Sequence, residues 1–194
     1  MTVQQSEYLS CAETAKLVRK ALKAAFPHVK FRVLSKTYSM GASIDVAWED
    51  GPRAERVKAI TDPFEGKSFD GMIDLAVANR HYITADGVVG YAGTQGTEGS
   101  HGTIAPVTNE IPEGARVVRF LADYIFPQRQ VSEYDTKLAE ALAHIRENCH
   151  TEGEEPDDRF ANDWVRDLAG RMVFDRDETE DVEAAFKRIV LRWS

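Results

Sequence analysis

The sequence predicts an α+β fold: a small antiparallel sheet with flanking helices, followed by a three-helix C-terminal part. Alternating apolar and polar residues mark short strands in the first two thirds of the chain, and helical spacing of apolar residues takes over from Ser132 onward. The chain has 194 residues, of which 43% are hydrophobic and 29% charged, as in a globular protein with its own core.

A capping box of Ser10 and Glu13 predicts the start of the first helix, and Pro27 predicts its end. Its apolar side consists of Ala15, Val18, Leu22, Ala25 and Phe26. Alternation then predicts one strand around residues 29–33 and a second around 44–48, joined through a turn at 39–41. Pro52 fits the first turn of another helix, which ends before Pro63.

In the middle of the chain, the turn sequence Ala85-Asp86-Gly87 between residues 81–84 and 88–91 predicts a hairpin. Glycine recurs every third residue from Gly90 to Gly102, which indicates a flexible surface loop over 90–103. Residues 117–126 alternate again. We expect one long strand there, with Phe120, Tyr124 and Phe126 on one face.

Three amphipathic helices follow, beginning near Tyr134, Pro156 and Val182. The expected organisation is an α+β domain over residues 1–130 and an acidic helical part over 131–194 that packs on it.

The segment from Pro63 to Asp74 contains two phenylalanines, two glycines and several charged residues. One interpretation is that Lys67 and Asp70, with Asp74, face a partner. The other, which we favour, is structural: Asp70-Gly71 makes a turn, while Phe69 and Met72 pack inward.

The first 130 residues resemble the large polyvalent protein-associated domain family, twenty-ninth type. The densest similarity is Pro63-Phe64-Glu65-Gly66-Lys67-x-Phe69-Asp70-Gly71-Met72, and further matches are Cys11-Ala12, Phe26-Pro27, Gly41-Ala42-Ser43-Ile44, Val46-x-Trp48, Asp50-Gly51-Pro52, Ala122–Phe126 and Arg129. The resemblance implies a protein carried by phages or conjugative elements that acts on, or protects, incoming DNA. It implies no catalytic residue set.

Charge is distributed unevenly. The net charge is −8, yet residues 1–60 carry +4 and residues 147–183 carry −10. The basic front contains Lys16, Arg19, Lys20, Lys23, Lys30 and Arg32, which could hold a phosphate backbone or could form an ordinary solvated face.

The acidic back contains Glu152, Glu154, Glu155, Asp157, Asp158, Asp163 and Asp167, and a second run from Asp175 to Glu183. Displayed together, these carboxylates could imitate DNA phosphates. Both runs also precede helices, where carboxylates stabilise the N-terminal turn, so capping is the competing interpretation.

We expect no cofactor, no metal site and no catalytic residue set, and the sequence favours a protein that is not an enzyme. Asp175-x-Asp177 after Met172-Val173-Phe174 imitates a phosphatase motif but lies near the C-terminus, and the pair Cys149-His150 lacks zinc spacing. No apolar run reaches membrane-spanning length, and no signal peptide is evident, so the host bacterial cytoplasm is the expected location.

The sequence therefore favours a phage or mobile-element accessory protein that inhibits a host defence system, of the anti-CRISPR or anti-restriction type, by binding a defence protein or nucleoprotein complex. Two alternatives stay open: a nucleic-acid-binding protein that protects incoming DNA through its basic front, and an uncharacterised enzyme. The oligomeric state is not predicted.

Overall fold

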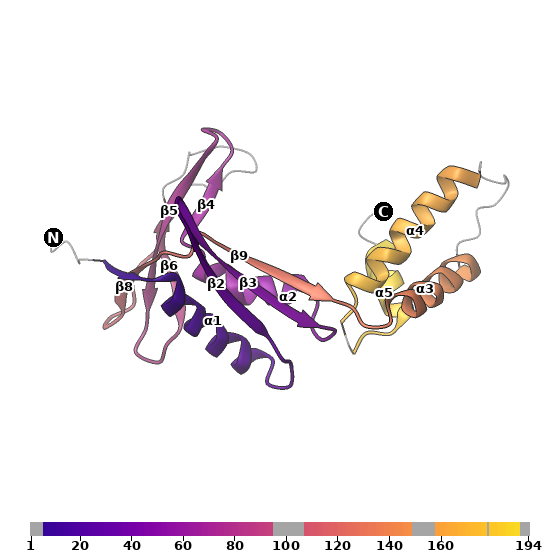
Figure 1. Ribbon diagram of the computed structural model, residues 1–194, viewed down its shortest axis with the longest axis horizontal. Helices are drawn as coiled ribbons and strands as arrows, with labels where there is room; N and C mark the ends of the chain where they lie inside the picture. Colours follow the sequence, from indigo (N-terminus) through magenta and orange to yellow (C-terminus); the bar gives the residue numbers. More distant parts are fainter. Residues whose placement is uncertain (1–5, 95–106, 149–157, 178, 191–194) are drawn as a thin grey trace. The chain divides into compact units, whose positions relative to one another are not determined.

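The computed structural model contains two sheets and five α-helices, and it describes residues 6–94, 107–148, 158–177 and 179–190 (Figure 1). Side chains of 107–108 and 158–164 are not described. The elements are β1 Glu7–Leu9, α1 Cys11–Ala25, β2 Arg32–Tyr38, β3 Gly41–Glu49, α2 Ala54–Thr61, a 3-10 turn η1 Asp62–Phe64, β4 Lys67–Asp70, β5 Leu75–Ile83, β6 Val89–Thr94, β7 Val107–Thr108, β8 Arg116–Phe120, β9 Tyr124–Gln130, α3 Tyr134–Asn148, α4 Asp158–Phe174 and α5 Val182–Val190. The predicted α+β class is confirmed.

The larger sheet has the order β1-β8-β5-β6-β7, and β4 pairs with β5 beyond the end of β8. The β5–β6 hairpin turns at Ala85-Asp86-Gly87 as expected, with Gly87 at φ 90°. One pair, β1 with β8, is parallel, so this sheet is mixed. The first two glycines of the 90–103 run, Gly90 and Gly93, lie in β6, and residues 95–103 fall outside the described ranges.

The second sheet has the order β2-β3-β9. The β2–β3 hairpin turns at Ser39-Met40, as predicted, although β2 begins at Arg32 rather than Val29. Residues 44, 46 and 48 of β3 are buried on one face, which is the alternation the sequence shows. In Figure 1, α1 runs beside β2.

The capping box at the start of α1 is formed. The Ser10 backbone N–H donates to Glu13 Oε2 at 2.8 Å, and the Glu13 N–H donates to Ser10 Oγ at 3.3 Å. The buried face of the helix is Cys11, Thr14, Ala15, Val18 and Leu22, and its lysines lie on the opposite, exposed side. This face and the buried face of the sheets make the core of the first part of the chain.

The expected long strand over 117–126 is wrong. It is two strands, β8 and β9, separated at Leu121–Asp123, where the backbone turns to bond other segments. The Leu121 N–H donates to the Leu9 carbonyl at 2.9 Å, and the Asp123 N–H donates to the Ala42 carbonyl at 2.7 Å. The break rotates Phe126 outward, so it is about half exposed while Phe120 is buried.

The chain divides into two compact units. The first comprises residues 1–47 and 57–128, and the second comprises 48–56 and 129–194. In the second unit, α3, α4 and α5 pack together around Ala141, Ile145, Leu168, Ala169, Met172, Val173 and Ile189 (Figure 1). None of the helices in the described ranges is both long enough and apolar enough to cross a membrane.

Candidate functional site

Gly66 holds the Pro63–Asp74 segment against the β8–β9 connection. Its N–H donates to the Ala122 carbonyl at 2.8 Å, and its carbonyl accepts from the Asn79 N–H at 2.8 Å. A Cβ at this position would lie 2.1 Å from the Phe120 carbonyl oxygen, which only glycine avoids. Phe64 is buried beside Phe120, with ring centroids 5.7 Å apart. Phe64 therefore anchors this segment to the core, and Gly66 lets its backbone reach the β8–β9 connection.

Lys67 is engaged within the first unit. Its Nζ lies 3.0 Å from Asp123 Oδ1, and its backbone N–H donates to the Asp123 carbonyl at 3.2 Å. The other carboxylate oxygen of Asp123 accepts from the Ala42 N–H at 3.3 Å. Lys67 thus links β4 to β3 and the β8–β9 connection, while its side chain keeps more than a third of its surface exposed.

Asp70 lies inside the fold, fully buried at the end of β4. Its Oδ1 accepts from the Met72 N–H at 3.0 Å, and the turn it closes ends at Asp74, whose φ is 52°. The structure thus gives Asp70 a role in shaping the turn between β4 and β5 and leaves its carboxylate out of reach of an external partner.

Large apolar side chains project from this turn into solvent. Phe69, Met72, Ile73 and Leu75, which we name the hairpin tip, are each at least half exposed. The expectation that Phe69 and Met72 pack inward is wrong, because β4 pairs with β5 beyond the end of β8 and no described element of the first unit covers this end of the hairpin. A group of exposed apolar side chains on a firmly bonded support is typical of a protein-binding surface.

Beneath the hairpin, β5 points two polar side chains inward. Asn79 is satisfied: its Nδ2 donates to the Glu65 carbonyl at 3.1 Å, and its Oδ1 accepts from Ser68 and Thr94. Sequence patterns gave no sign of this network, because it joins residues of β4, β5 and β6 with Glu65, which follows η1.

His81 is fully buried, and neither ring nitrogen has a hydrogen-bond partner in the described part of the chain. Its ring lies 4.9 Å from that of Tyr91 and 4.7 Å from that of Phe120. Burial lowers the pKa of His81 from 6.5 to about 4, so it is neutral at pH 7. With no hydrogen-bond partner among the described residues, its ring packs here as an aromatic core residue.

The basic residues predicted to hold nucleic acid all lie on the surface of the first unit. Lys16, Arg19, Lys20 and Lys23 follow one another along α1 at helical spacing, and Lys30 and Arg32 follow the helix; all six are exposed. Arg19 Nη2 donates to the Val33 carbonyl at 2.7 Å. Within the described ranges, the other five form no ion pair.

The first acidic run is only partly described. Glu152, Glu154, Glu155 and Asp157 fall outside the described residues, and Asp158 and Asp163 lie in α4 without described side chains. Asp167 is exposed on α4 and pairs with Arg171 at 2.8 Å.

The second acidic run is largely neutralised by its own neighbourhood. Asp177 Oδ2 lies 3.8 Å from Arg53 Nε, and Asp177 Oδ1 lies 3.6 Å from Arg56 Nη1. Glu180 Oε1 lies 2.8 Å from Arg188 Nε. Asp181 accepts from the Ala184 N–H at the start of α5, and Glu183 pairs with Lys187 at 2.6 Å. Asp181 thus caps α5, in agreement with the capping interpretation, whereas Asp177, Glu180 and Glu183 are held in ion pairs.

Arg129 and Asp50 organise the second unit in a way the sequence did not reveal. Arg129 donates to four backbone carbonyls, those of Asp50, Gly51, Phe174 and Arg176, at 3.2, 2.9, 2.7 and 2.7 Å. The Asp50 carboxylate accepts from the N–H and Oγ of Ser132 and from Lys137 Nζ. Burial raises the pKa of Asp50, but these hydrogen bonds outweigh it and hold the pKa below its usual range.

The described residues contain no group of three or more histidine, cysteine or acidic side chains able to hold a metal ion. Met172–Phe174 belong to α4, so the phosphatase-like motif does not follow a strand. The Cys149-His150 pair lies outside the described ranges.

A family model, large polyvalent protein associated domain 29, matches residues 9–132. The match covers more than half of the chain and includes everything from the last residue of β1 to the end of β9. The chain belongs to this family. Large polyvalent protein associated domains of this kind are associated with phages and mobile elements. Helices α3, α4 and α5 lie beyond the matched region. Neither the curated proteins nor the solved structures contain a match to the chain.

Proposed function

We propose that this protein is a mobile-element accessory factor that inhibits a host defence complex, of the CRISPR or restriction type, by binding one of its proteins. The observation that carries the proposal is the hairpin tip: four apolar side chains, each at least half exposed, on a hairpin that the Gly66 and Lys67 contacts hold in place. Exposed apolar anchors on a pre-ordered support lose little conformational entropy on binding.

The charge distribution supports a basic partner. The first unit carries twelve Lys/Arg and twelve Asp/Glu, whereas the second carries twelve and twenty. The net charge of −8 therefore belongs to the second unit. Defence complexes that handle nucleic acids display basic surfaces, and an acidic body would speed encounter with them.

Within this proposal, the acidic run Glu152, Glu154, Glu155, Asp157, Asp158, Asp163 and Asp167 supplies the second contact. It would occupy a basic nucleic-acid site of the partner while the hairpin tip supplies apolar anchoring. Because Asp177, Glu180 and Glu183 form local ion pairs and Asp181 caps α5, we assign these four residues no part in binding.

The test is capture of partners from the bacterial host of the element, with mass spectrometry and three baits. Wild type should retain a defence protein at moderate salt. Replacing Met72 and Ile73 by Ser should remove it, and reversing the charge of Glu154, Glu155, Asp157 and Asp158 should weaken capture and reduce its salt dependence.

Met40→Ser is the matched control, since Met40 is the most exposed of the large apolar residues described and lies on a different turn. It should capture the partner like wild type. Capture that survives the Met72/Ile73 double change, or a retained protein unrelated to defence, contradicts the proposal.

Nucleic-acid binding through the basic front is the second candidate. It is favoured by the row of exposed lysines on α1, which form no ion pair within the described residues, on a unit with no net negative charge. It predicts DNA binding that weakens steeply with salt and a smaller salt slope after Lys16, Lys20 and Lys23 are changed to Gln. A flat gel-shift titration at low salt would exclude it.

A further inference from the structure

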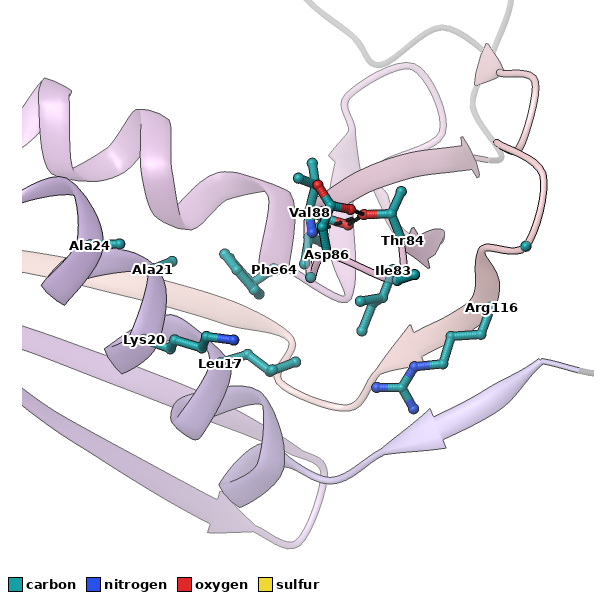
Figure 2. A pocket seen from close by; sticks show the side chains of 14 residues that line it. Leu17, Lys20, Ala21, Ala24, Phe64, Ile83, Thr84, Asp86, Val88 and Arg116 are labelled. Atoms are coloured by element: carbon teal, nitrogen blue, oxygen red, sulfur yellow. Dashed lines mark hydrogen bonds between the residues drawn. The ribbon is translucent and has the colours of Figure 1, made fainter.

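A cavity of about 540 Å³ lies in the first unit between α1, the β5–β6 turn and the start of β8 (Figure 2). Space remains there because α1 offers Ala21 and Ala24 to it, where a leucine would fill the gap. Phe64 and Ile83 add apolar surface. A volume of this size matches that of pockets for small organic ligands.

The charged groups at the cavity are mainly cationic. Figure 2 shows Lys20 and Leu17 extending from α1 on one side and Arg116 entering from β8 on the other. Lys20 Nζ would be 3.8 Å from a Cβ at Gly87, so it stands close to the turn backbone, and it has no ion-pair partner in the described ranges. Arg116 shares its charge with Glu7, at 2.8 Å.

Among the described residues that line the cavity, Asp86 is the one carboxylate, and it is bonded within the turn. Asp86 accepts a hydrogen bond from Thr84 Oγ1 at 2.5 Å, and this bond lowers the pKa of Asp86. The Thr84 N–H in turn donates to the Val88 carbonyl at 2.9 Å. Lys20 is thus left as the cation available to an incoming group, with its alkyl stem along the apolar wall.

We propose that this cavity binds a small ligand with an apolar body and a single anionic group, a carboxylate or a phosphate. The body would lie against Phe64, Ile83 and the alanines of α1, and the anion would accept hydrogen bonds from Lys20, with Arg116 adding positive potential. This site is separate from the hairpin tip and does not depend on the inhibition proposed above, and Lys20 is the residue that it shares with the basic front.

The test is calorimetric titration of the full chain with three ten-carbon probes: decanoate, decyl phosphate and decanol. Both anions should bind at a single site, and decanol should bind about tenfold more weakly, because it lacks the charge that Lys20 pairs with. The two anionic probes decide whether a carboxylate or a phosphate is preferred.

Variants locate the site. Lys20→Gln should lower the affinity for the anions about tenfold and leave decanol unchanged, whereas Lys23→Gln on the same helix should change neither. Ala24→Trp, at an exposed helix position, should block all three probes. Phe69→Ser in the hairpin tip should not affect them.

The proposal is overturned if decanol binds as tightly as decanoate, if Lys20→Gln and Lys23→Gln behave alike, or if Ala24→Trp still binds the anions. Thermal unfolding of each variant identifies any that fails to fold, and Lys20→Gln, an exposed change, then carries the decision alone.

Discussion

Gly66 lies where two backbone segments approach too closely for any side chain. The Phe120 and Ala122 carbonyl oxygens would be 2.1 and 2.9 Å from an added Cβ, and both belong to main chain that cannot rotate away. The sequence shows two glycines in this segment, but it could not say which contact requires a glycine. That contact comes from the β8–β9 connection, far along the chain.

Gly66→Ala should destabilise the first unit by about 2–3 kcal/mol, because the β8–β9 connection must shift to admit the methyl group. Thermal or urea unfolding measures this. Gly170→Ala in α4 is the control: its Cβ would meet nothing nearer than 3.8 Å, and alanine favours the helix, so its stability should hold or rise. Equal stability of Gly66→Ala and wild type would contradict the close approach.

His81 makes stability depend on pH. Its folded pKa of about 4 lies below the ordinary 6.5, so the unfolded chain takes up the proton first as pH falls. Stability from this residue is complete above pH 6.5 and is lost between pH 6.5 and about 4, by roughly 3 kcal/mol.

His81→Phe should remove this component, since phenylalanine fits between the Tyr91 and Phe120 rings and has no proton to bind. Urea unfolding at several pH values between 4 and 7 should show a wild-type loss that the variant lacks. Parallel pH profiles for the two proteins would mean that His81 is not isolated from water or from other polar groups.

Elements with local signals were predictable, and elements made by distant pairing were not. The capping box of α1 and the turn of the Asp86-Gly87 hairpin are each formed by residues that lie close together in the sequence. β1 exists because Glu7–Leu9 align with Val118–Phe120, and β4 exists because β5 lies beside it. The exposure of the hairpin tip was missed for the same reason: apolar residues are usually core, and only topology leaves these uncovered.

Among the elements of the second unit, Arg129 bonds the segment after β3 to the end of α4. Arg129→Ala should leave the Asp50 and Gly51 carbonyls and those at the end of α4 without their shared donor, at a cost of about 3 kcal/mol. Hydrogen exchange should then rise in residues 48–56 and 174–177. Arg146→Ala, at an exposed position of α3, should leave exchange unchanged. Unaltered protection in Arg129→Ala would contradict its bridging role.

At the scale of the whole molecule, the composition gives a net negative charge, and the division into two units shows which unit carries that charge. The first unit is neutral, and the second holds the net charge of −8. Sequence alone could not separate a carboxylate used in an ion pair, such as Asp177, from those available to a partner, because the cation of that pair is Arg53, far away in the sequence.

The proposed inhibition is tested most directly by the DNA-cleaving activity of the captured defence complex, titrated with purified protein. Wild type should abolish cleavage near one equivalent per binding site, Met40→Ser should do the same, and the Met72→Ser, Ile73→Ser double variant should leave cleavage intact. Undiminished cleavage at saturating wild-type protein, or equal inhibition by the double variant, would contradict the account.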